Sequence, residues 1–191
     1  MRISLLIITV LISSSLQAQQ SFDVAQIKTN HGEILFWMYP ETVNHKKSFI
    51  KLANEGYWDT LTFNRVIDNF VAQGGCPDTE EGFSESPYLL EPEFFPEIRH
   101  TYGAVGAGRD DNPGKLSAGC QFYIVQRKEG LDYLDDNYTI FGQVIKGMEV
   151  IDAIVALQTD DRDQPLEDVT LDINILQMSK EQIEKLGFII P

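Results

Sequence analysis

Residues 63–75 read Phe-Asn-Arg-Val-Ile-Asp-Asn-Phe-Val-Ala-Gln-Gly-Gly, and this stretch decides how the rest of the chain is interpreted. It places one arginine, Arg65, and one glutamine, Gln73, among apolar residues of strand character. A charged group in apolar surroundings needs a reason, because removing it from water costs free energy. We expect a groove that grips a neutral polypeptide at one backbone carbonyl while burying an apolar side chain beside it.

Short strands dominate the chain on both sides of this stretch. Alternating apolar residues predict strands at 24–29, 33–38, 62–66, 70–73, 103–108, 121–126, 140–145 and 169–178. Helical spacing predicts helices at 40–55, 148–157 and 180–186. The proline-rich segment 76–101 has no sustained period, so we expect a long surface loop there.

This pattern indicates a mainly β fold. We expect a closed antiparallel barrel of eight strands capped by two helices, with a short C-terminal helix. Periodicity alone leaves a β-sandwich open. Because no internal repeat or linker divides the chain, residues 19–191 are expected to form a single domain.

The first 18 residues resemble a signal peptide. Arg2 supplies a positive start, Ile3–Ile12 is almost wholly apolar, and Ala18 ends a run of small and polar residues. The apolar run is shorter than the roughly 20 residues that span a bilayer, so cleavage is favoured over an uncleaved anchor or a buried first strand. We expect export to a periplasm, with secretion from the cell as the alternative and no membrane association after cleavage.

The formal net charge of −14 argues against nucleic acid and anionic lipid as partners, since both require a basic surface. The histidines His31, His45 and His100 are widely spaced and have no neighbouring ligand at metal-binding spacing, so no transition-metal site is expected. Cys76 and Cys120 are the only cysteines, and in an exported protein they favour one disulfide over a metal site.

Three motifs in order resemble those of the cyclophilins, the peptidyl-prolyl cis/trans isomerases. The first lies within residues 63–75; the others comprise Gly119, Gln121, Phe122, Tyr123 and Ile124, and then Leu131, Tyr133, Leu134, Asp135, Phe141 and Gly142. They are followed by Val144, Gly147 and Met148. Each motif alone is weakly specific, but three at compatible spacing are specific, and the resemblance runs from about Val24 to Met178.

The resemblance implies an enzyme that accelerates rotation about X-Pro peptide bonds in exported or unfolded polypeptides and so assists folding. It implies no cofactor and proline-containing polypeptides as partners, and we expect a monomer. The reaction needs fixed donors and an apolar seat for the ring, without a nucleophile, base or metal. A proline-binding chaperone or interaction module with little turnover is the alternative, and the presence of Arg65 and Gln73 favours turnover.

The resemblance also assigns site residues. Arg65 matches the catalytic arginine, and Gln73 matches the glutamine that orients it and contacts the substrate carbonyl. Phe70, Phe122 and Leu134 match the walls of the proline pocket.

Further positions at the predicted groove match the family less exactly. Val71 stands where methionine is usual, and Tyr138 stands at the pocket edge in place of a common histidine. Gln121 matches a glutamine lining the neighbouring pocket for residues before proline. Arg109 lies where an asparagine commonly presents its backbone to substrate.

Three departures affect what we expect of the site. Asn64 stands where histidine is usual, and strand alternation points it away from the face of Arg65. Tyr133 replaces the tryptophan associated with tight cyclosporin binding, so weak cyclosporin binding is expected. The usually glycine-rich loop is here the acidic stretch Asp78–Pro87, so we expect specificity and turnover rate to depart from those usual in the family.

Other chemistries fit the sequence less well. A cysteine hydrolase built on Cys120 has only His100 as a base, with no orienting partner suggested. A calcium loop starting at Asp110 has glutamine in place of glutamate at its twelfth position, so a plain turn is favoured. The glycines between 103 and 108 lack phosphate-loop spacing, and close packing of a strand against the groove explains them better.

The resemblance bears on the two cysteines as well. In a cyclophilin-like barrel, Cys76 follows one groove strand and Cys120 precedes another, so the two strand ends are expected to be neighbours. A Cys76–Cys120 disulfide is therefore a possible pairing, with two small buried thiols as the alternative.

Overall fold

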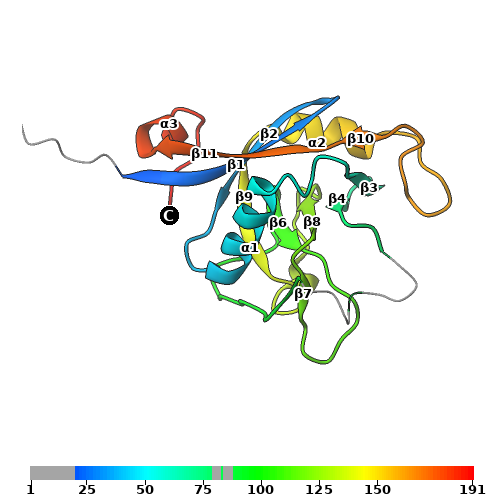
Figure 1. The fold of residues 1–191 in the computed structure, drawn as a ribbon, viewed down its shortest axis with the longest axis horizontal. Helices are drawn as coiled ribbons and strands as arrows, with labels where there is room; N and C mark the ends of the chain where they lie inside the picture. Colours follow the sequence, from blue (N-terminus) through cyan, green and yellow to red (C-terminus); the bar gives the residue numbers. More distant parts are fainter. Residues whose placement is uncertain (1–19, 79–82, 84–87) are drawn as a thin grey trace, which may run out of the picture.

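The computed structural model describes residues 20–78, 83 and 88–191 (Figure 1). The predicted signal peptide lies outside the described residues, as does most of the acidic stretch 78–87. Within the described part, no helix combines the length and apolar character needed to cross a bilayer.

All the predicted strands and helices are present, with shifted ends. The strands are β1 (Ser21–Thr29), β2 (Gly32–Met38), β3 (Thr62–Ile67), β4 (Val71–Gly75), β5 (Leu89–Leu90), β6 (Ala104–Ala107), β7 (Ser117–Ala118), β8 (Gln121–Val125), β9 (Ile140–Lys146), β10 (Val169–Thr170) and β11 (Asp172–Ser179). The helices are α1 (Val43–Asn54), the 3-10 helix η1 (Asp132–Leu134), α2 (Met148–Val155) and α3 (Lys180–Glu184). Sequence periodicity missed β5, β7 and η1, which are too short to show a period.

The sheet closes on itself as a barrel. Its nine strands run in the order β10-β3-β4-β8-β6-β9-β2-β1-β11, and every pairing is antiparallel. The two edge strands β10 and β11 are consecutive in the chain, so one stretch, residues 169–179, pairs with β3 at one edge and β1 at the other. The arrangement decides between barrel and sandwich in favour of the barrel.

The strand count differs from the predicted eight because the last strand is interrupted at Leu171. The Leu171 amide donates to Leu61 O at 3.1 Å, outside both ladders, and its side chain is buried. The chain thereby changes partner from β3 to β1. Counted as one strand, β10 and β11 give the eight-stranded barrel that the sequence predicts.

Side chains alternate across the barrel wall. Those facing inward build one aromatic core, in which Phe49 packs on Trp58 at 5.3 Å between ring centroids and Trp58 on Phe122 at 5.5 Å. Phe63 meets Phe122 at 5.7 Å. Aromatic side chains each bury about 150–250 Å² and dominate such cores.

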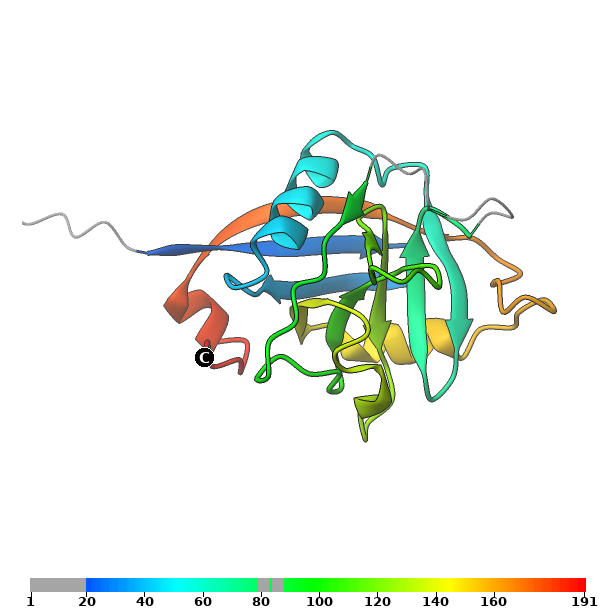
Figure 2. The same cartoon turned by 90° about the horizontal axis from the view of Figure 1, so that it is seen from below.

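The long helices α1 and α2 cover opposite ends of the barrel (Figure 2). Helix α1 has no side-chain cap of its own; Glu93, from the loop before β6, accepts hydrogen bonds from the Asn44 and His45 amides at 3.0 Å. The Glu93 carboxylate also lies 2.7 Å from His45 Nδ1. An acceptor at a helix N-terminus satisfies free N–H groups and favours negative charge, so the loop anchors the helix.

The segment 76–101 is less irregular than expected. β5 within it pairs with β7, which lies in the connection between β6 and β8. The Gly119 amide extends this pairing by donating to Tyr88 O at 2.8 Å. A strand of two residues is too short to show alternation, so the sequence could not predict β5 or β7.

A disulfide joins Cys76 and Cys120, whose Cα atoms are 5.5 Å apart. It links the residue after β4 to the residue before β8, two strands that pair directly. The Cys76 amide also donates to Cys120 O at 2.9 Å. The bond therefore closes the end of this strand pair.

We expect reduction of this disulfide to lower the free energy of unfolding by about 2–4 kcal/mol, because the two cysteines are 44 residues apart and their bond restricts the unfolded chain. Urea unfolding with and without a reductant measures the difference. The double variant Cys76→Ser, Cys120→Ser is the control and should not respond to reductant. Equal unfolding curves for the oxidised and reduced wild type would contradict the prediction.

Candidate active site

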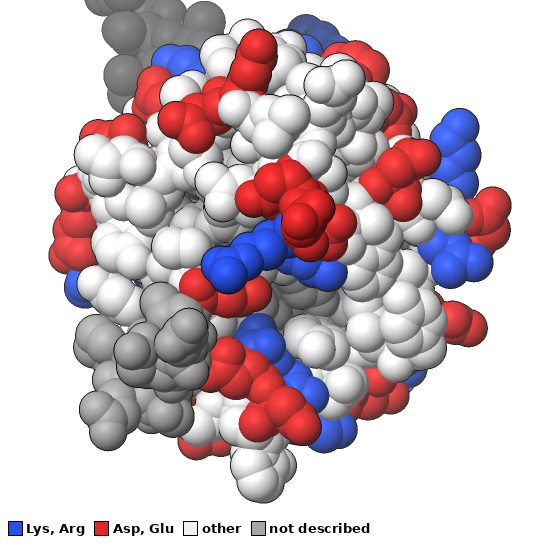
Figure 3. All heavy atoms as spheres, turned by 90° about the vertical axis from the view of Figure 1, so that its right-hand side faces the viewer, with Lys and Arg blue, Asp and Glu red and all other residues white. Residues whose placement is uncertain are grey.

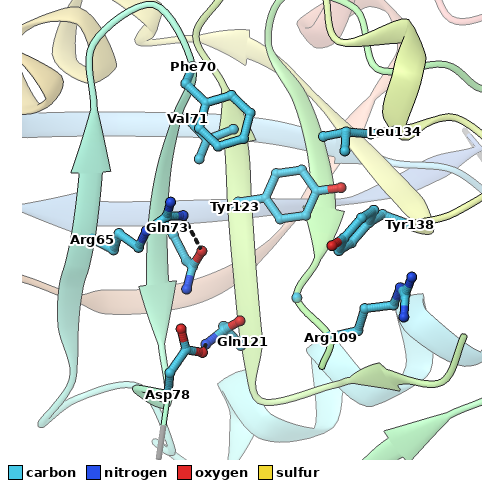
Figure 4. A pocket seen from close by; sticks show the side chains of 11 residues that line it. Arg65, Phe70, Val71, Gln73, Asp78, Arg109, Gln121, Tyr123, Leu134 and Tyr138 are labelled. Carbon is cyan, nitrogen blue, oxygen red and sulfur yellow. Dashed lines mark hydrogen bonds between the residues drawn. The ribbon is translucent and has the colours of Figure 1, made fainter. Parts of the chain in front are cut away.

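Arg65 and Gln73 lie side by side on the outer wall of the barrel. Arg65 in β3 is directly opposite Gln73 in β4, and the guanidinium Nη1 donates to Gln73 Oε1 at 3.4 Å (Figure 4). Arg65 Nε lies 3.7 Å from Asp163 Oδ2, and the Arg65 side chain is 34% exposed. These two contacts leave further guanidinium N–H groups for a ligand.

A bulge in β3 turns Arg65 outward. Phe63 pairs with Gly74 and Arg65 with Gln73, so Asn64 is the extra residue between them. Residues two apart in a regular strand share a face, yet Phe63 is in the core and Arg65 faces the groove. Asn64 donates to Gly75 O at 2.8 Å, which fixes the bulge.

The bulge corrects the expectation that Asn64 points away from the face of Arg65. Asn64 and Arg65 instead line one hollow beside the groove, together with Gln73, Pro77, Asp78, Arg162 and Gln164. Strict alternation fails here because the bulge shifts the period by one residue.

A pocket with one apolar and one polar side includes the Arg65–Gln73 pair in its lining. It has a volume of about 200 Å³. Its lining residues are Arg65, Phe70, Val71, Gln73, Asp78, Gly108, Arg109, Gln121, Tyr123, Leu134 and Tyr138. Figure 4 shows Phe70, Val71, Tyr123, Leu134 and Tyr138 around one side and the polar groups around the other.

The structure therefore brings together eight of the ten residues predicted from the sequence: Arg65, Phe70, Val71, Gln73, Arg109, Gln121, Leu134 and Tyr138. The two that it does not bring to the pocket are Phe122 and Tyr133. Tyr133 is 63% exposed and is not among the lining residues.

Phe122 faces the barrel interior, where it is 1% exposed and contacts Phe49, Trp58 and Phe63. Its neighbour Tyr123 forms the pocket wall instead. Gln121 and Tyr123 share the outer face of β8 because strand side chains alternate. Applied to β8, this alternation would have identified Tyr123, since Gln121 was already assigned to the groove.

At the polar end of the pocket, two hydrogen bonds fix the side chain of Gln121. Gln121 Nε2 donates to Cys76 O at 3.0 Å and to Asp78 Oδ1 at 2.8 Å. Asp78 was recognised only as the start of the acidic stretch, and no pattern in the sequence linked it to Gln121. The disulfide and this pair of hydrogen bonds together fix the chain that leaves β4.

Arg109 forms the opposite polar wall. Its guanidinium donates to Asn137 O at 2.9 Å, to Asn137 Oδ1 at 2.7 Å and to Asp110 O at 2.7 Å. Its Cζ also lies 4.8 Å from the ring centroid of Tyr138. With these contacts Arg109 acts as a rigid brace for Tyr138, whereas the resemblance implied only a role for its backbone.

Two glycines of the β6 segment make room for the groove residues. Gly106 pairs directly with Tyr123, and a Cβ on Gly106 would overlap the tyrosine ring and hydroxyl. A Cβ on Gly108 would overlap the amide of Gln121. Close packing against the groove therefore explains Gly106 and Gly108, whereas a Cβ on Gly103 would meet the Gln143 side chain, which does not line the pocket.

A buried polar chain lies behind Tyr123. His100 Nδ1 is 2.6 Å from Asp135 Oδ1, and His100 Nε2 is 2.7 Å from the Tyr123 hydroxyl. Burial lowers the pKa of His100 below its ordinary value of 6.5, although Asp135 acts to raise it. Burial also raises the pKa of Tyr123 well above its ordinary value, so the phenol stays neutral.

This chain corrects one part of the hydrolase argument, because His100 does have an orienting carboxylate. The conclusion is unchanged. Cys120 is bonded to Cys76 and is no nucleophile, and the atom facing His100 Nε2 is the Tyr123 hydroxyl.

The charges of the groove contrast with those of the whole chain. Arg65 and Arg109 line the pocket and Arg162 lines the adjoining hollow, in a chain of net charge −14. Figure 3 shows basic side chains meeting at the centre of one face beside a hollow, with acidic side chains around them. The arginines are well suited to donate hydrogen bonds to backbone carbonyls.

No group of three or more His, Cys, Asp or Glu side chains among the described residues is placed to hold a metal ion. The former calcium candidate forms a turn: Asn112 Oδ1 accepts from the Leu116 amide at 2.8 Å, and Asp110 Oδ2 accepts from the Phe83 amide.

Comparison with known proteins points to one family. Residues 24–174 match the family model described as cyclophilin type peptidyl-prolyl cis-trans isomerase/CLD. A Staphylococcus saprophyticus protein named "Putative peptidyl-prolyl cis-trans isomerase" is 31% identical over 75% of this chain and 86% of its own length. A Staphylococcus aureus protein of the same name is 30% identical over 82% of this chain and 92% of its own.

Solved structures similar to this chain point to the same family. A cyclophilin type peptidyl-prolyl cis-trans isomerase from Cryptosporidium parvum, crystallised in the presence of the dipeptide Ala-Pro, has a TM-score of 0.71 at 26% identity. The match covers 80% of this chain and 98% of that one. A cyclophilin from Hirschia baltica, at 19% identity, a TM-score of 0.62, and coverage of 85% of this chain and 76% of that one, shares the fold.

We expect Gly106→Ala to lower the free energy of unfolding by about 1–3 kcal/mol, because the new methyl group would displace the rigid ring of Tyr123. Gly114→Ala is the matched control, since its Cβ would come no closer than 3.4 Å to another side chain. Urea unfolding of both variants measures the effect. A Gly106→Ala curve that coincides with that of Gly114→Ala would refute the packing explanation.

Proposed function

The chain belongs to the cyclophilin-type peptidyl-prolyl cis-trans isomerase family, and on this premise we propose that Arg65 and Gln73 act together on an X-Pro bond held in the pocket that they line. As a member of the family, the chain is a peptidyl-prolyl isomerase. The observation that carries the proposal is the Arg65–Gln73 pair, registered across two strands beside the pocket.

The reaction requires only a rotation. Amide resonance gives the X-Pro bond a barrier of about 20 kcal/mol, and twisting the bond makes the proline nitrogen pyramidal and gives it a lone pair. In this proposal Arg65 donates to that nitrogen, because a guanidinium carries a positive charge and presents several N–H groups in one plane. Its donation is stronger in the twisted state than in the planar one, which is what accelerates the rotation.

Gln73 has two tasks in this scheme. Its Oε1 accepts from Arg65 and so fixes the plane of the guanidinium. Its Nε2 remains to donate to the substrate carbonyl oxygen, which moves as the bond rotates. Gln73 is only 8% exposed, so this hydrogen bond forms out of bulk water.

The geometry can supply the free energy that catalysis needs. An acceleration of about ten-thousandfold corresponds to about 5.5 kcal/mol of differential stabilisation. A charge-assisted hydrogen bond in a partly desolvated groove supplies a large share of that value. Phe70, Val71, Tyr123 and Leu134 seat the proline ring and exclude water around it.

The proposed clients are exported or unfolded polypeptides that contain proline, and the proposed role is to assist their folding. The Cys76–Cys120 disulfide supports export, because structural disulfides persist in oxidising compartments. We propose that residues 1–18 direct export to a periplasm and are removed there. The acidic net charge supports a partner other than nucleic acid or anionic lipid.

Weak cyclosporin binding is part of the same proposal. Tyr133 stands in place of the tryptophan associated with tight binding, and its side chain is 63% exposed. Tyrosine offers a smaller apolar face than tryptophan and lacks the indole N–H donor.

We expect Arg65→Ala to lower kcat/KM for a prolyl tetrapeptide by about 100-fold or more, because the donor to the twisted bond is lost. Arg65→Lys should recover only part of this loss, since an ammonium group cannot satisfy Gln73 and substrate in one plane. A protease-free assay of isomerisation measures the rates, and peptide titration measures the affinities.

Lys28→Ala is the control for this experiment. Lys28 is also a strand cation near a carboxylate, at 4.0 Å from Asp172, but it lies on β1 and lines no pocket described above. Its rate should equal that of the wild type. If Arg65→Ala turned over peptide as fast as the wild type while both bound it, the catalytic role of Arg65 would be lost. If both bound peptide and neither exceeded the uncatalysed rate, the chain would be a proline-binding module.

Export has its own test. Full-length protein expressed in a Gram-negative host should appear in the periplasmic fraction with Gln19 as its first residue, and intact-mass spectrometry reads this directly. Replacing Leu6 and Ile7 with arginine interrupts the apolar run and should keep the precursor in the cytoplasm. An unprocessed wild-type chain would remove the basis for the proposed location.

A further inference from the structure

His100 joins two walls of the proline pocket from behind. Its ring contacts Tyr123 on β8 through Nε2 and Asp135 through Nδ1, at 2.7 Å and 2.6 Å. Asp135 is the C-cap of η1, whose last residue is Leu134. Tyr123 and Leu134 both line the pocket, so His100 contacts one wall directly and holds the segment that carries the other.

The backbone reinforces this connection. The His100 amide donates to Asp135 Oδ1 at 2.9 Å, and His100 O accepts from the Leu131 amide at 2.8 Å. His100 and Tyr123 rings are stacked, with 12° between their planes. The His100 residue is 2% exposed, so these hydrogen bonds do not compete with water.

The partners fix where the protons lie. A carboxylate can only accept, so His100 Nδ1 carries a proton and donates it to Asp135. In the neutral ring Nε2 then has a lone pair and accepts from the Tyr123 hydroxyl. A second proton on His100 would occupy Nε2, and the hydroxyl would have to accept from it and leave its own proton without this acceptor.

We propose that His100 and Asp135 are positioning residues for the isomerase reaction. While His100 is neutral, the two residues hold Tyr123 and the Leu134 end of η1 in place as walls of the pocket. The inference rests on the function proposed above. His100 and Asp135 contact no substrate; they act through the two side chains that do. At acidic pH, when His100 is protonated, Tyr123 and Leu134 should therefore be held less firmly at the pocket.

Other charged groups around the chain set the pH at which this occurs. Arg99 lies 3.8 Å from Asp135 and 3.2 Å from Asp136, and its charge opposes protonation of His100. On the other side, Tyr138 and Arg109 face Tyr123. Since burial lowers the pKa of His100, the neutral form prevails at pH 7 and activity should fall only below about pH 6.5.

A second buried histidine provides a matched control. His45 is also 2% exposed, and its Nδ1 also lies 2.7 Å from a carboxylate, that of Glu93. It stacks on Phe141 in the main core and has no contact with the pocket. Replacing His45 removes a similar buried histidine–carboxylate pair without altering a residue that lines the pocket.

The test compares the pH profile of kcat/KM for His100→Gln, His100→Asn and His45→Gln in a protease-free assay from about pH 8 to pH 5. The wild type and His45→Gln should lose activity as the pH falls below about 6.5, and neither His100 variant should show this fall. At pH 7.5, His100→Asn should be slower than wild type by about tenfold, because it can reach Asp135 but gives Tyr123 no acceptor. His100→Gln, whose amide oxygen can reach the hydroxyl, should be faster than His100→Asn.

Three results would overturn the proposal: a flat wild-type profile, folded His100 variants with the wild-type profile, or a His45→Gln profile altered in the same way as theirs. If both His100 variants fail to fold, Tyr123→Phe decides. Its profile should lack the fall below about pH 6.5, because no hydroxyl remains for His100 to hold when neutral and release when protonated, and a profile with the wild-type fall would overturn the proposal.

The two proposals fail separately. A wild-type rate no higher than the uncatalysed rate at pH 7.5 would remove the catalytic function. The pH dependence of peptide affinity, measured on the same variants, would then test the positioning role without turnover. An affinity that does not change between wild type and the His100 variants at any pH would overturn the positioning role.

Discussion

The alternation of side chains across the barrel wall, shifted by one residue at Asn64, is the constraint on which the groove depends. Without that bulge, Phe63 and Arg65 would share a face, and either the core would lose an aromatic ring or the groove would lose its cation. One extra residue in β3 separates the two functions of this strand. The same alternation on β8 places Phe122 inside and Tyr123 outside.

Most of the fold and of the site could be predicted because both follow patterns that a sequence displays. The barrel strands alternate, and Arg65, Gln73 and Gln121 stand out as polar residues on apolar strands. The errors have physical causes: a bulge is invisible to a period of two, and Phe122 was assigned by motif where alternation favoured Tyr123. The roles of Asp78 and His100 depend on contacts between residues 23 or more positions apart, such as the His100–Tyr123 pair, for which a single sequence has no local signal.

The groove is built from side chains that are each held from outside it. Gln121 is held by Asp78 and the chain at Cys76, Arg109 by Asn137, and Tyr123 by His100. A rotation about one bond requires walls that do not follow the substrate as it turns, because stabilisation of the twisted state depends on donors that are already in place. The buried hydrogen bonds behind the groove provide that rigidity.

Residues 169–179, which close the barrel, also determine which strand edges an incomplete chain leaves exposed. β3, which carries Arg65, has β10 as its outer neighbour, and β10 contributes only Val169 and Thr170 to that edge. A chain emerging from a ribosome therefore presents β1 and β3 as open edges until nearly all of the domain has been synthesised. A nascent chain that stops before Val169 carries its arginine on a sheet edge to which another extended polypeptide can add as a strand.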